Sequence, residues 1–307
     1  MYYFIVNIKS RSGKAETLWN KIKLELENKN IDYKYFISEY PGHEKLIAEE
    51  LTEKIKEPFI LVAVGGDGTI NKVINGIKNF EYVSFATIQT GSGNDFSRGL
   101  NRKDDSIKIL NDILSKKSVK KLDICKLKSL NKDYSKKFVI SSGIGFDASI
   151  CLHSNDSSFK TILNKSFLRK LIYIFSAIIM FTKYKPIDIK VEDSKGKISE
   201  YKKVYFCTVM NLPYEGGGAM LCPDANGFDD LVNLCIIYQD KIFPPIITML
   251  KSIKGHHKNS KNSVLLKDKY FIIETKNKTW VHTDGEKAKY FSRLKFSVNR
   301  EKLKFIA

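Results

Sequence analysis

The sequence lacks the cysteine and histidine patterns of redox and zinc-binding proteins. Its five cysteines are dispersed along 307 residues without a CxxC pair, which indicates reduced thiols in a cytosolic protein. The five histidines form no HExxH or other paired metal spacing. The longest apolar run, residues 171–182, is far shorter than the roughly 20 residues that span a bilayer. No basic region precedes the apolar residues 1–6, so we expect them to form a strand and not a signal peptide.

Acidic residues are also few, since 34 of them are set against 52 lysines and arginines, and the formal net charge is +18. This surplus predicts a polyanionic partner, which could be nucleic acid, an anionic membrane surface or a nucleotide. A lysine-rich codon bias explains the surplus about as well. Nucleic acid is the least favoured partner, because specific readers depend on arginine and no stretch interleaves aromatic with basic residues as RNA-binding motifs do.

The first part of the chain predicts an α/β domain over residues 1–120. Strand-like and helix-like segments alternate there, as is typical of a mostly parallel sheet that is covered on both faces. We expect strands over residues 2–8, 33–37, 61–64 and 82–87, and helices over residues 15–28, 44–56, 70–76 and 106–115.

From residue 121 the pattern changes to short β-rich runs separated by turns, the first of them over residues 121–128. This change predicts an antiparallel, β-sandwich-like domain over residues 121–307, whose final residues are free to pack back on the first domain. Two helical inserts are expected, over residues 159–183 and 241–254, and a basic loop follows the second.

Residues 61–69, LVAVGGDGT, combine a buried strand, a glycine turn and the start of a helix. Gly65 and Gly66 let the backbone turn tightly and admit a ligand against it. Free N–H groups and the helix dipole favour an anion at such a turn, which predicts a phosphate site. Asp67 is placed to face a metal or a hydroxyl. An ordinary strand-to-helix turn is the less favoured alternative, because two adjacent glycines are followed by Asp-Gly-Thr.

A second small-residue turn, residues 90–95, follows the next predicted strand. Ligands bind parallel sheets at the carboxyl ends of the strands, so both turns are expected in one site. Ser92 can donate to a phosphate, and Asp67 and Asp95 would converge there on Mg²⁺. The alternative is that Asp95 only caps a helix. Residues 9–14 lack the first glycine of a P-loop and predict a phosphate contact or an ordinary surface turn.

Two acidic stretches of the second domain supply further candidates. Residues 223–230 offer several oxygen ligands in a short space, as hard cations require, although a solvated turn has the same composition. Residues 282–286, HTDGE, form a tight turn whose two carboxylates at i and i+2 suit a general base for a hydroxyl. Many turns of this composition are simply hairpin tips.

Taken in order, these stretches resemble the motifs of the diacylglycerol-kinase catalytic superfamily. The similarity is greatest to its bacterial soluble lipid kinases, which are related to sphingosine and ceramide kinases. One glycine turn is moderately specific, whereas the ordered set is strong because it spans nearly the whole chain. The matching stretches are residues 65–69, 91–98, 122–124, 143–148, 216–218, 223–230 and 284–286.

The resemblance implies that ATP binds in the cleft between the two domains, with its phosphates on the turn over residues 66–72. It implies that Glu286 accepts a hydroxyl proton, with Asp284 close behind it as the second candidate. The implied ATP-binding residues are Asn7, Ser10, Ser38, Gly65, Gly66, Asp67, Gly68, Thr69, Ile70, Asn71, Lys72, Ser92, Asn94 and Asp95.

The resemblance also implies Mg²⁺. One ion is structural and takes one carboxylate with flanking main-chain oxygens, and a water-linked acidic network surrounds the metals. The structural site would comprise Asp229, Asn226 and Leu231, and the network would comprise Asp67, Asp95 and Asp123.

The sequence departs from the family pattern at two of these places. Ile8 stands in the first turn where the family usually has Pro. Asp230 replaces the Gly that usually follows Asp229, which would add a ligand or misplace the structural ion.

The implied activity is that of an ATP-dependent lipid kinase, which transfers the γ-phosphoryl group to the hydroxyl of diacylglycerol or a related lipid held by the second domain. A cytoplasmic enzyme in peripheral contact with anionic membrane is expected, without a nucleic-acid partner, and either helical insert is a candidate for the contact. The alternatives are an NAD kinase-like enzyme and a noncatalytic, basic regulator that binds a nucleotide or a membrane. The sequence leaves open which lipid is used and the oligomeric state, a homodimer included.

Overall fold

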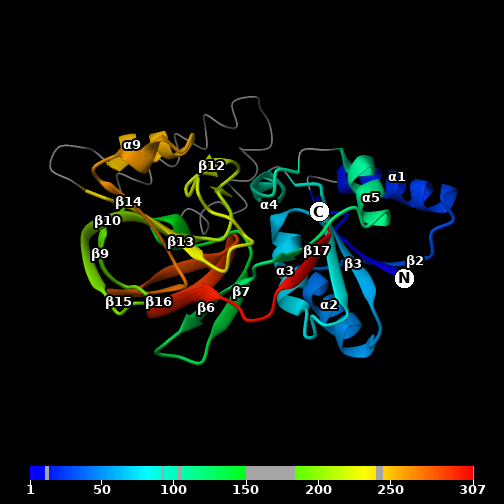
Figure 1. The fold of residues 1–307 in the computed structure, drawn as a ribbon, viewed down its shortest axis with the longest axis horizontal. Helices are drawn as coiled ribbons and strands as arrows, with labels where there is room; N and C mark the ends of the chain where they lie inside the picture. The colour runs from blue at the N-terminus through cyan, green and yellow to red at the C-terminus, as the bar shows by residue number, and fades with distance from the viewer. Residues whose placement is uncertain (11–13, 92, 103–104, 150–183, 240–244, 307) are drawn as a thin grey trace.

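The computed structural model describes residues 1–10, 14–91, 93–102, 105–149, 184–239 and 245–306. These residues form two domains that lie side by side, one with a helix-covered sheet and one built mainly of strands (Figure 1). Ser92 and the predicted insert over residues 159–183 lie outside the described residues.

The N-terminal sheet has six strands in the order β2-β1-β3-β4-β17-β5. Its pairs are parallel except that β5 runs antiparallel to β17, as the sequence predicts for a mostly parallel sheet. The strands are β1 (Tyr2–Val6), β2 (Tyr33–Ile37), β3 (Phe59–Gly65), β4 (Val83–Gln89), β5 (Val119–Leu122) and β17 (Leu303–Ile306).

Helices cover both faces of this sheet because its central strand is apolar throughout. Every residue of β3 is buried, and alternate residues enter two different hydrophobic clusters. One cluster contains Trp19 of α1 and Leu110 of α5, and the other contains Ala48 of α2 and Ile70 of α3. The helices are α1 (Lys14–Asn28), α2 (His43–Lys54), α3 (Asp67–Gly76), α4 (Asp95–Gly99) and α5 (Ser106–Leu114).

The C-terminal domain contains a nine-stranded antiparallel sheet in the order β14-β13-β10-β8-β15-β16-β6-β7, with β9 paired to β10 and β15. A short hairpin, β11 with β12, lies beside it. The strands are β6 (Cys125–Ser129), β7 (Ser135–Phe138), β8 (Ser141–Gly145), β9 (Ile187–Glu192), β10 (Ile198–Met210), β11 (Tyr214–Glu215), β12 (Ala219–Met220), β13 (Val232–Tyr238), β14 (Ser263–Asp268), β15 (Tyr270–Thr283) and β16 (Glu286–Val298).

The chain crosses between the domains at residues 123–124. The single run expected over residues 121–128 is therefore wrong: it divides into β5, which joins the first sheet, and β6, which joins the second. The buried Asp123 interrupts it, and its N–H donates to the carbonyl of Gly227 at 2.7 Å. The expected domain boundary near residue 120 thus falls within β5.

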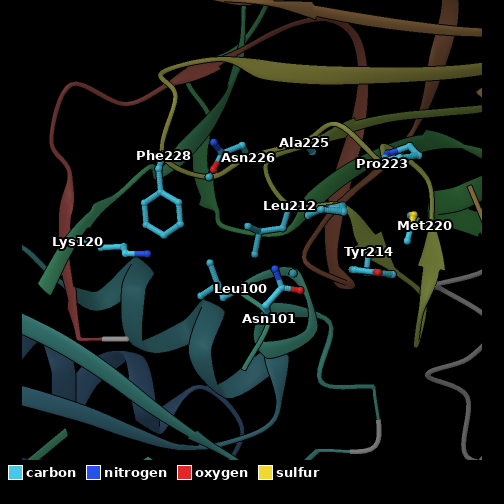
Figure 2. A pocket seen from close by; sticks show the side chains of 13 residues that line it. Leu100, Asn101, Lys120, Leu212, Tyr214, Met220, Pro223, Ala225, Asn226 and Phe228 are labelled. Atoms are coloured by element: carbon cyan, nitrogen blue, oxygen red, sulfur yellow. The ribbon is translucent and has the colours of Figure 1, made fainter. Parts of the chain in front are cut away.

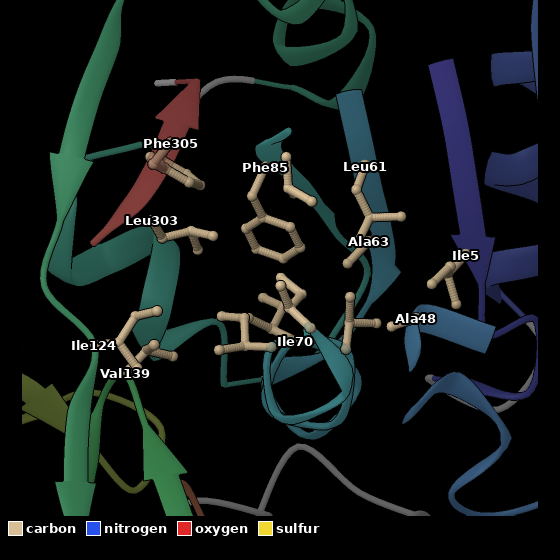
Figure 3. Packing of buried hydrophobic residues seen from close by; sticks show 14 of the residues in the cluster. Ile5, Ala48, Leu61, Ala63, Ile70, Phe85, Ile124, Val139, Leu303 and Phe305 are labelled. Atoms are coloured by element: carbon tan, nitrogen blue, oxygen red, sulfur yellow. The ribbon is translucent and has the colours of Figure 1, made fainter. Parts of the chain in front are cut away.

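The two domains share a packed seam. β17 crosses back from the second domain to the N-terminal sheet (Figure 1). In the strand order of that sheet it lies between β4 and β5. Ile124 and Val139 belong to the same hydrophobic cluster as Phe85, Leu303 and Phe305 of the N-terminal sheet (Figure 3). This continuous packing gives residues from both ends of the chain fixed positions relative to one another.

The second predicted insert is a short helix, α9 (Pro245–Ser252), in its described part, and a 3₁₀ turn, η2 (His256–Asn259), follows it. β14 follows in turn, and the sequence reading did not include this strand. Within the described residues, no helix is long and apolar enough to span a bilayer.

Candidate active site

The two glycine turns lie against each other at the carboxyl ends of β3 and β4. The N–H of Thr90 donates to the carbonyl of Gly65 at 2.9 Å. A Cβ atom on Gly91 would lie 3.0 Å from the Cα atom of Gly66, so the close approach requires glycine. In the described part of the chain, no side chain caps the N-terminus of α3. Its first N–H groups are therefore oriented to receive an anion.

The first turn and the β2–α2 loop meet the same edge of the sheet. The side-chain amide of Asn7 donates to Thr69 Oγ1 at 3.1 Å and to Glu44 at 3.0 Å. Ser10 Oγ lies 2.5 Å from Thr90 Oγ1, and the N–H of buried Ser38 donates to Val6 at 2.9 Å. The structure thus brings together the segments that the resemblance assigns to ATP.

Asp67 and Asp95 converge near Gly93, where a Cβ atom would lie 3.4 Å and 3.7 Å from their Oδ2 atoms. Asp67 accepts hydrogen bonds from Gln89 and from the N–H groups of Asp95 and Phe96. Burial raises the pKa of Asp67, which these hydrogen bonds oppose, and raises the pKa of Asp95 to about 6.

Asp95 also links the domains. Its carboxylate pairs with Arg98 and accepts the N–H of Gly217, in the loop after β11, at 2.7 Å. Oδ1 of the neighbouring Asn94 is buried without a hydrogen-bond partner among the described residues. Asp67 and Asp95 already accept protein N–H groups, so a Mg²⁺ ion that accompanies phosphates would use the lone pairs that these bonds leave free, together with Asn94 Oδ1.

The acidic turn between β15 and β16 is a tight hairpin in which Thr283 pairs with Glu286. Asp284 and Gly285 have φ angles of +48° and +75°, as a type I′ turn requires. The carboxylate of Asp284 is buried and accepts four hydrogen bonds, from Asn71 Nδ2 at 2.7 Å and from three consecutive main-chain N–H groups at 2.8–3.0 Å, those of residues 139–141. Burial raises the pKa of Asp284, and the hydrogen bonds oppose this rise.

Glu286 extends from this turn to the glycine turn of the other domain. Its Oε1 atom lies 3.1 Å from Lys72 Nζ, and a Cβ atom on Gly68 would lie 2.8 Å from it. The side chain keeps 34% of its surface exposed. A carboxylate 214 positions from Lys72 therefore stands beside the first turn of α3, open to an incoming hydroxyl.

The residues implied for a structural metal do not fit one. Asp229 Oδ2 lies 2.6 Å from Lys267 Nζ, and its Oδ1 accepts the N–H of Leu231 at 3.1 Å. Asn226 is exposed in the wall of a separate pocket of about 450 Å³, beside Phe228 (Figure 2). A lysine and an N–H group therefore face the carboxylate, where a metal site would present oxygen atoms.

Asp123 is likewise joined to protein groups. Its fully buried carboxylate contacts the ammonium of Lys302 and accepts the N–H of Asp230 at 2.8 Å. Lys302 also pairs with the carboxylate of Asp230, the residue that replaces the family's glycine. No described contact connects Asp123 with Asp67 or Asp95, and the water-linked network that the resemblance implies stays a prediction.

We expect Lys302→Met to lower the free energy of unfolding by about 3 kcal/mol, because it leaves a buried carboxylate without its counter-charge. Urea unfolding measures this. Lys304→Met is the matched control, since Lys304 lies exposed two positions later on β17, with its Nζ on the carbonyl of Glu81. An equal effect of both changes would contradict the lysine-bridged arrangement.

Other predicted residues take structural positions. The side chain of Ile70 is fully buried in the hydrophobic core, so only its main chain can meet a ligand. Asn71 binds Asp284 and is buried. The sequence reading missed a cluster of Asp147, Glu215 and His282, whose ligand atoms lie within 4.8 Å of one another. The available signal was that His282 stands near the end of β15, two positions before Asp284 of the acidic turn.

Residues 1–127 match the family model described as diacylglycerol kinase catalytic domain, and residues 139–304 match that described as YegS C-terminal NAD kinase beta sandwich-like domain. The chain is 28% identical over 295 residues to a Bacillus subtilis (strain 168) protein named "Putative lipid kinase YtlR", with 93% of each covered. It is 23% identical over 233 residues to a diacylglycerol kinase of the same strain, with 76% of this chain and 72% of that protein covered.

A solved structure shares the fold. The crystal structure of a diacylglycerol kinase from Bacillus anthracis str. Sterne superimposes with a TM-score of 0.73 at 20% identity and covers 99% of this chain and 96% of that chain. The predicted fold class, an α/β domain followed by an antiparallel β-sandwich-like domain, is confirmed.

Proposed function

Because this chain belongs to the family that joins a diacylglycerol kinase catalytic domain to a YegS C-terminal NAD kinase beta sandwich-like domain, we infer that it is an ATP-dependent lipid kinase. Membership implies a kinase that uses ATP. The finer proposal is transfer of the γ-phosphoryl group to the hydroxyl of diacylglycerol or a related lipid. The observation that carries it is the carboxylate of Glu286 beside the uncapped N-terminus of α3.

The phosphates of ATP would lie on the N–H groups that follow Gly66, with Lys72 near the γ-phosphate. Asp67, Asp95 and Asn94 would hold Mg²⁺, which neutralises charge on the transferring phosphoryl group when bound. The two glycines keep side chains out of this site, since a Cβ atom on Gly91 would lie only 3.0 Å from the Cα atom of Gly66. The preorganised N–H groups stabilise charge without reorganising during the reaction.

Glu286 would accept the proton of the lipid hydroxyl as the hydroxyl oxygen bonds to the γ-phosphorus and ADP departs. Asp284 suits this role less, because its two oxygens already accept four hydrogen bonds. The ammonium of Lys72, 3.1 Å from Oε1 of Glu286, would hold the carboxylate in place beside the hydroxyl.

A phosphorylation assay tests the proposal. Purified protein with labelled Mg-ATP is incubated with micelles of diacylglycerol, phosphatidylglycerol, a sphingoid base or a polyprenol, and in parallel with NAD. We expect label in the lipid extract and none in NAD. Label in NAD would support the NAD kinase-like alternative, and label in no acceptor would support the noncatalytic one.

We further infer that α9 contacts an anionic bilayer, where a lipid substrate resides. The helix buries Pro245, Thr248 and Ser252, and Thr248 donates to Asn262 at 2.6 Å. Two apolar residues of the helix, Ile247 and Leu250, and Ile253 directly after it are exposed, by 45%, 45% and 43%. Exposed lysines at positions 251 and 254 lie among them. An apolar face with basic neighbours suits an anionic membrane surface.

Leu250→Glu should weaken binding to phosphatidylglycerol vesicles about tenfold, because it replaces a buriable leucine by a charge that the surface repels. Vesicle sedimentation at low and high salt measures the change. The matched control is Leu24→Glu, at an exposed leucine of α1. Equal losses in both variants would argue against a specific role of α9.

A further inference from the structure

The cluster of Asp147, Glu215 and His282 is buried and has no part in the proposed transfer. His282 Nε2 lies 3.0 Å from Asp147 Oδ2 and 3.2 Å from Glu215 Oε1. The other oxygen of Glu215 accepts the hydroxyl of Thr208 at 3.1 Å. Two carboxylates therefore surround one ring nitrogen, and the second ring nitrogen faces the acidic turn.

The hydrogen bonds define the protonation of this ring. His282 Nδ1 accepts the N–H of Gly285 at 3.2 Å, and a nitrogen that accepts an N–H carries no proton. The ring proton is therefore on Nε2, where the two carboxylates accept it. A protonated Nε2 cannot bind a metal, so the spacing of the cluster suits a shared proton better than an ion.

The ring stands where it can hold the turn that carries Glu286. Gly285 is exposed, and its N–H is bonded to His282. Asp284, the residue before it, is held by its own four hydrogen bonds. Fixing both central residues of the turn sets the direction in which the chain enters β16, and therefore where Glu286 meets Gly68.

The neighbouring backbone leaves room for this arrangement. A Cβ atom on Gly143 of β8 would lie 2.4 Å from His282 Nε2 and 1.7 Å from Asp147 Oδ2. The glycine thus allows the ring and the carboxylate to meet over the strand. Glu215 lies two positions before Gly217, whose N–H binds Asp95, so the same cluster adjoins the phosphate end of the site.

We propose that His282 is a positioning residue for Glu286, and that Asp147 and Glu215 hold its ring in the Nε2–H form. The proposal rests on the proposed function, since it takes Glu286 as the proton acceptor. His282 itself touches no reacting atom. It acts by holding Gly285, and through Gly285 the backbone that presents the carboxylate to the site.

Two substitutions distinguish the roles of the two ring nitrogens, because each keeps the hydrogen bond of one nitrogen and removes that of the other. His282→Gln retains an N–H near the position of Nε2 but loses the acceptor for Gly285. His282→Asn retains an acceptor near the position of Nδ1 but removes the donor shared by Asp147 and Glu215. We expect the glutamine variant to melt near the wild-type temperature with kcat reduced about tenfold or more and an unchanged KM for ATP. The asparagine variant should have a lower melting temperature than the glutamine variant but a higher kcat. Both are assayed at a temperature at which both are folded.

The opposite order, in which kcat follows the melting temperature, would show that His282 only stabilises the fold and would overturn the proposal. Two readouts do not require activity. Hydrogen exchange at the Gly285 amide should be slow in wild type and in His282→Asn but fast in His282→Gln. Nitrogen-15 NMR of wild type should show His282 unprotonated at Nδ1.

Each result bears on the proposal separately from the proposed function. Fast Gly285 exchange in wild type, a protonated Nδ1, or Mn²⁺ or Zn²⁺ binding that His282→Gln abolishes would overturn the proposal even in an active enzyme. If no lipid is phosphorylated while the exchange and NMR results are as expected, the proposed function is overturned. The role of His282 in holding the turn is then still supported.

Discussion

Glu286→Gln is expected to lower kcat by about 10³-fold, because glutamine has nearly the same shape but cannot accept the proton of the lipid hydroxyl. The affinity for ATP should stay near that of wild type, since the contacts of Glu286 with α3 are an ion pair with Lys72 and an approach to Gly68, and glutamine keeps the size of this side chain. Initial rates with a saturating lipid measure kcat, and equilibrium binding of ATP measures the affinity.

The control for this change is Glu274→Gln. Glu274 lies on β15, in the same hairpin, and forms an exposed ion pair with Arg293 at 3.3 Å. The Glu274→Gln variant should have the same kcat as wild type. Wild-type turnover by Glu286→Gln would remove Glu286 from the role of proton acceptor, and a loss of ATP binding would assign it to the nucleotide site.

Asp284→Asn is expected to lower the free energy of unfolding by about 4 kcal/mol, because its new amide group faces N–H donors and leaves two of them unpaired in the interior. The four bonds of Asp284 connect the C-terminal turn to Asn71 of α3 and to the main chain at residues 139–141. Turnover should fall as well, since the same bonds hold the turn that carries Glu286. Urea unfolding measures the stability loss.

Asp224→Asn provides the comparison, because Asp224 is exposed and pairs with Lys258 at the surface. It should change the unfolding free energy by less than about 0.5 kcal/mol. If Asp284→Asn were as stable as wild type and lost only turnover, Asp284 would take part in the chemistry. It would then not be a residue whose hydrogen bonds stabilise the contact between the two domains.

The sequence predicted the N-terminal domain well, because its signals are local. β2 has the predicted bounds, and α1, α5 and β3 differ from prediction by a few residues at their ends. The alternation of buried strand, glycine turn and helix depends on neighbours in the chain. Local signals failed at Asp123, where one hydrophobic pattern continues through a change of sheet.

The metal assignments show the same limit. Asp229 and Asp123 were assigned to metals by their place in motifs, but Asp229 pairs with Lys267 and Asp123 pairs with Lys302, which come from distant segments. A motif gives the ligands that a site offers. It does not show which ammonium groups the fold brings to the same carboxylates.

By itself, the sequence determined the fold class, the order of the motifs and the two glycine turns, because each depends on the backbone needs and hydrophobic pattern of adjacent residues. Only the tertiary structure decided how two alike carboxylates differ. Asp284 is buried and accepts four hydrogen bonds, whereas the side chain of Glu286, two positions later, stays partly exposed beside Lys72. The reason is that burial and hydrogen-bond partners come from segments more than a hundred positions away, and their approach is set by the packing of the two domains.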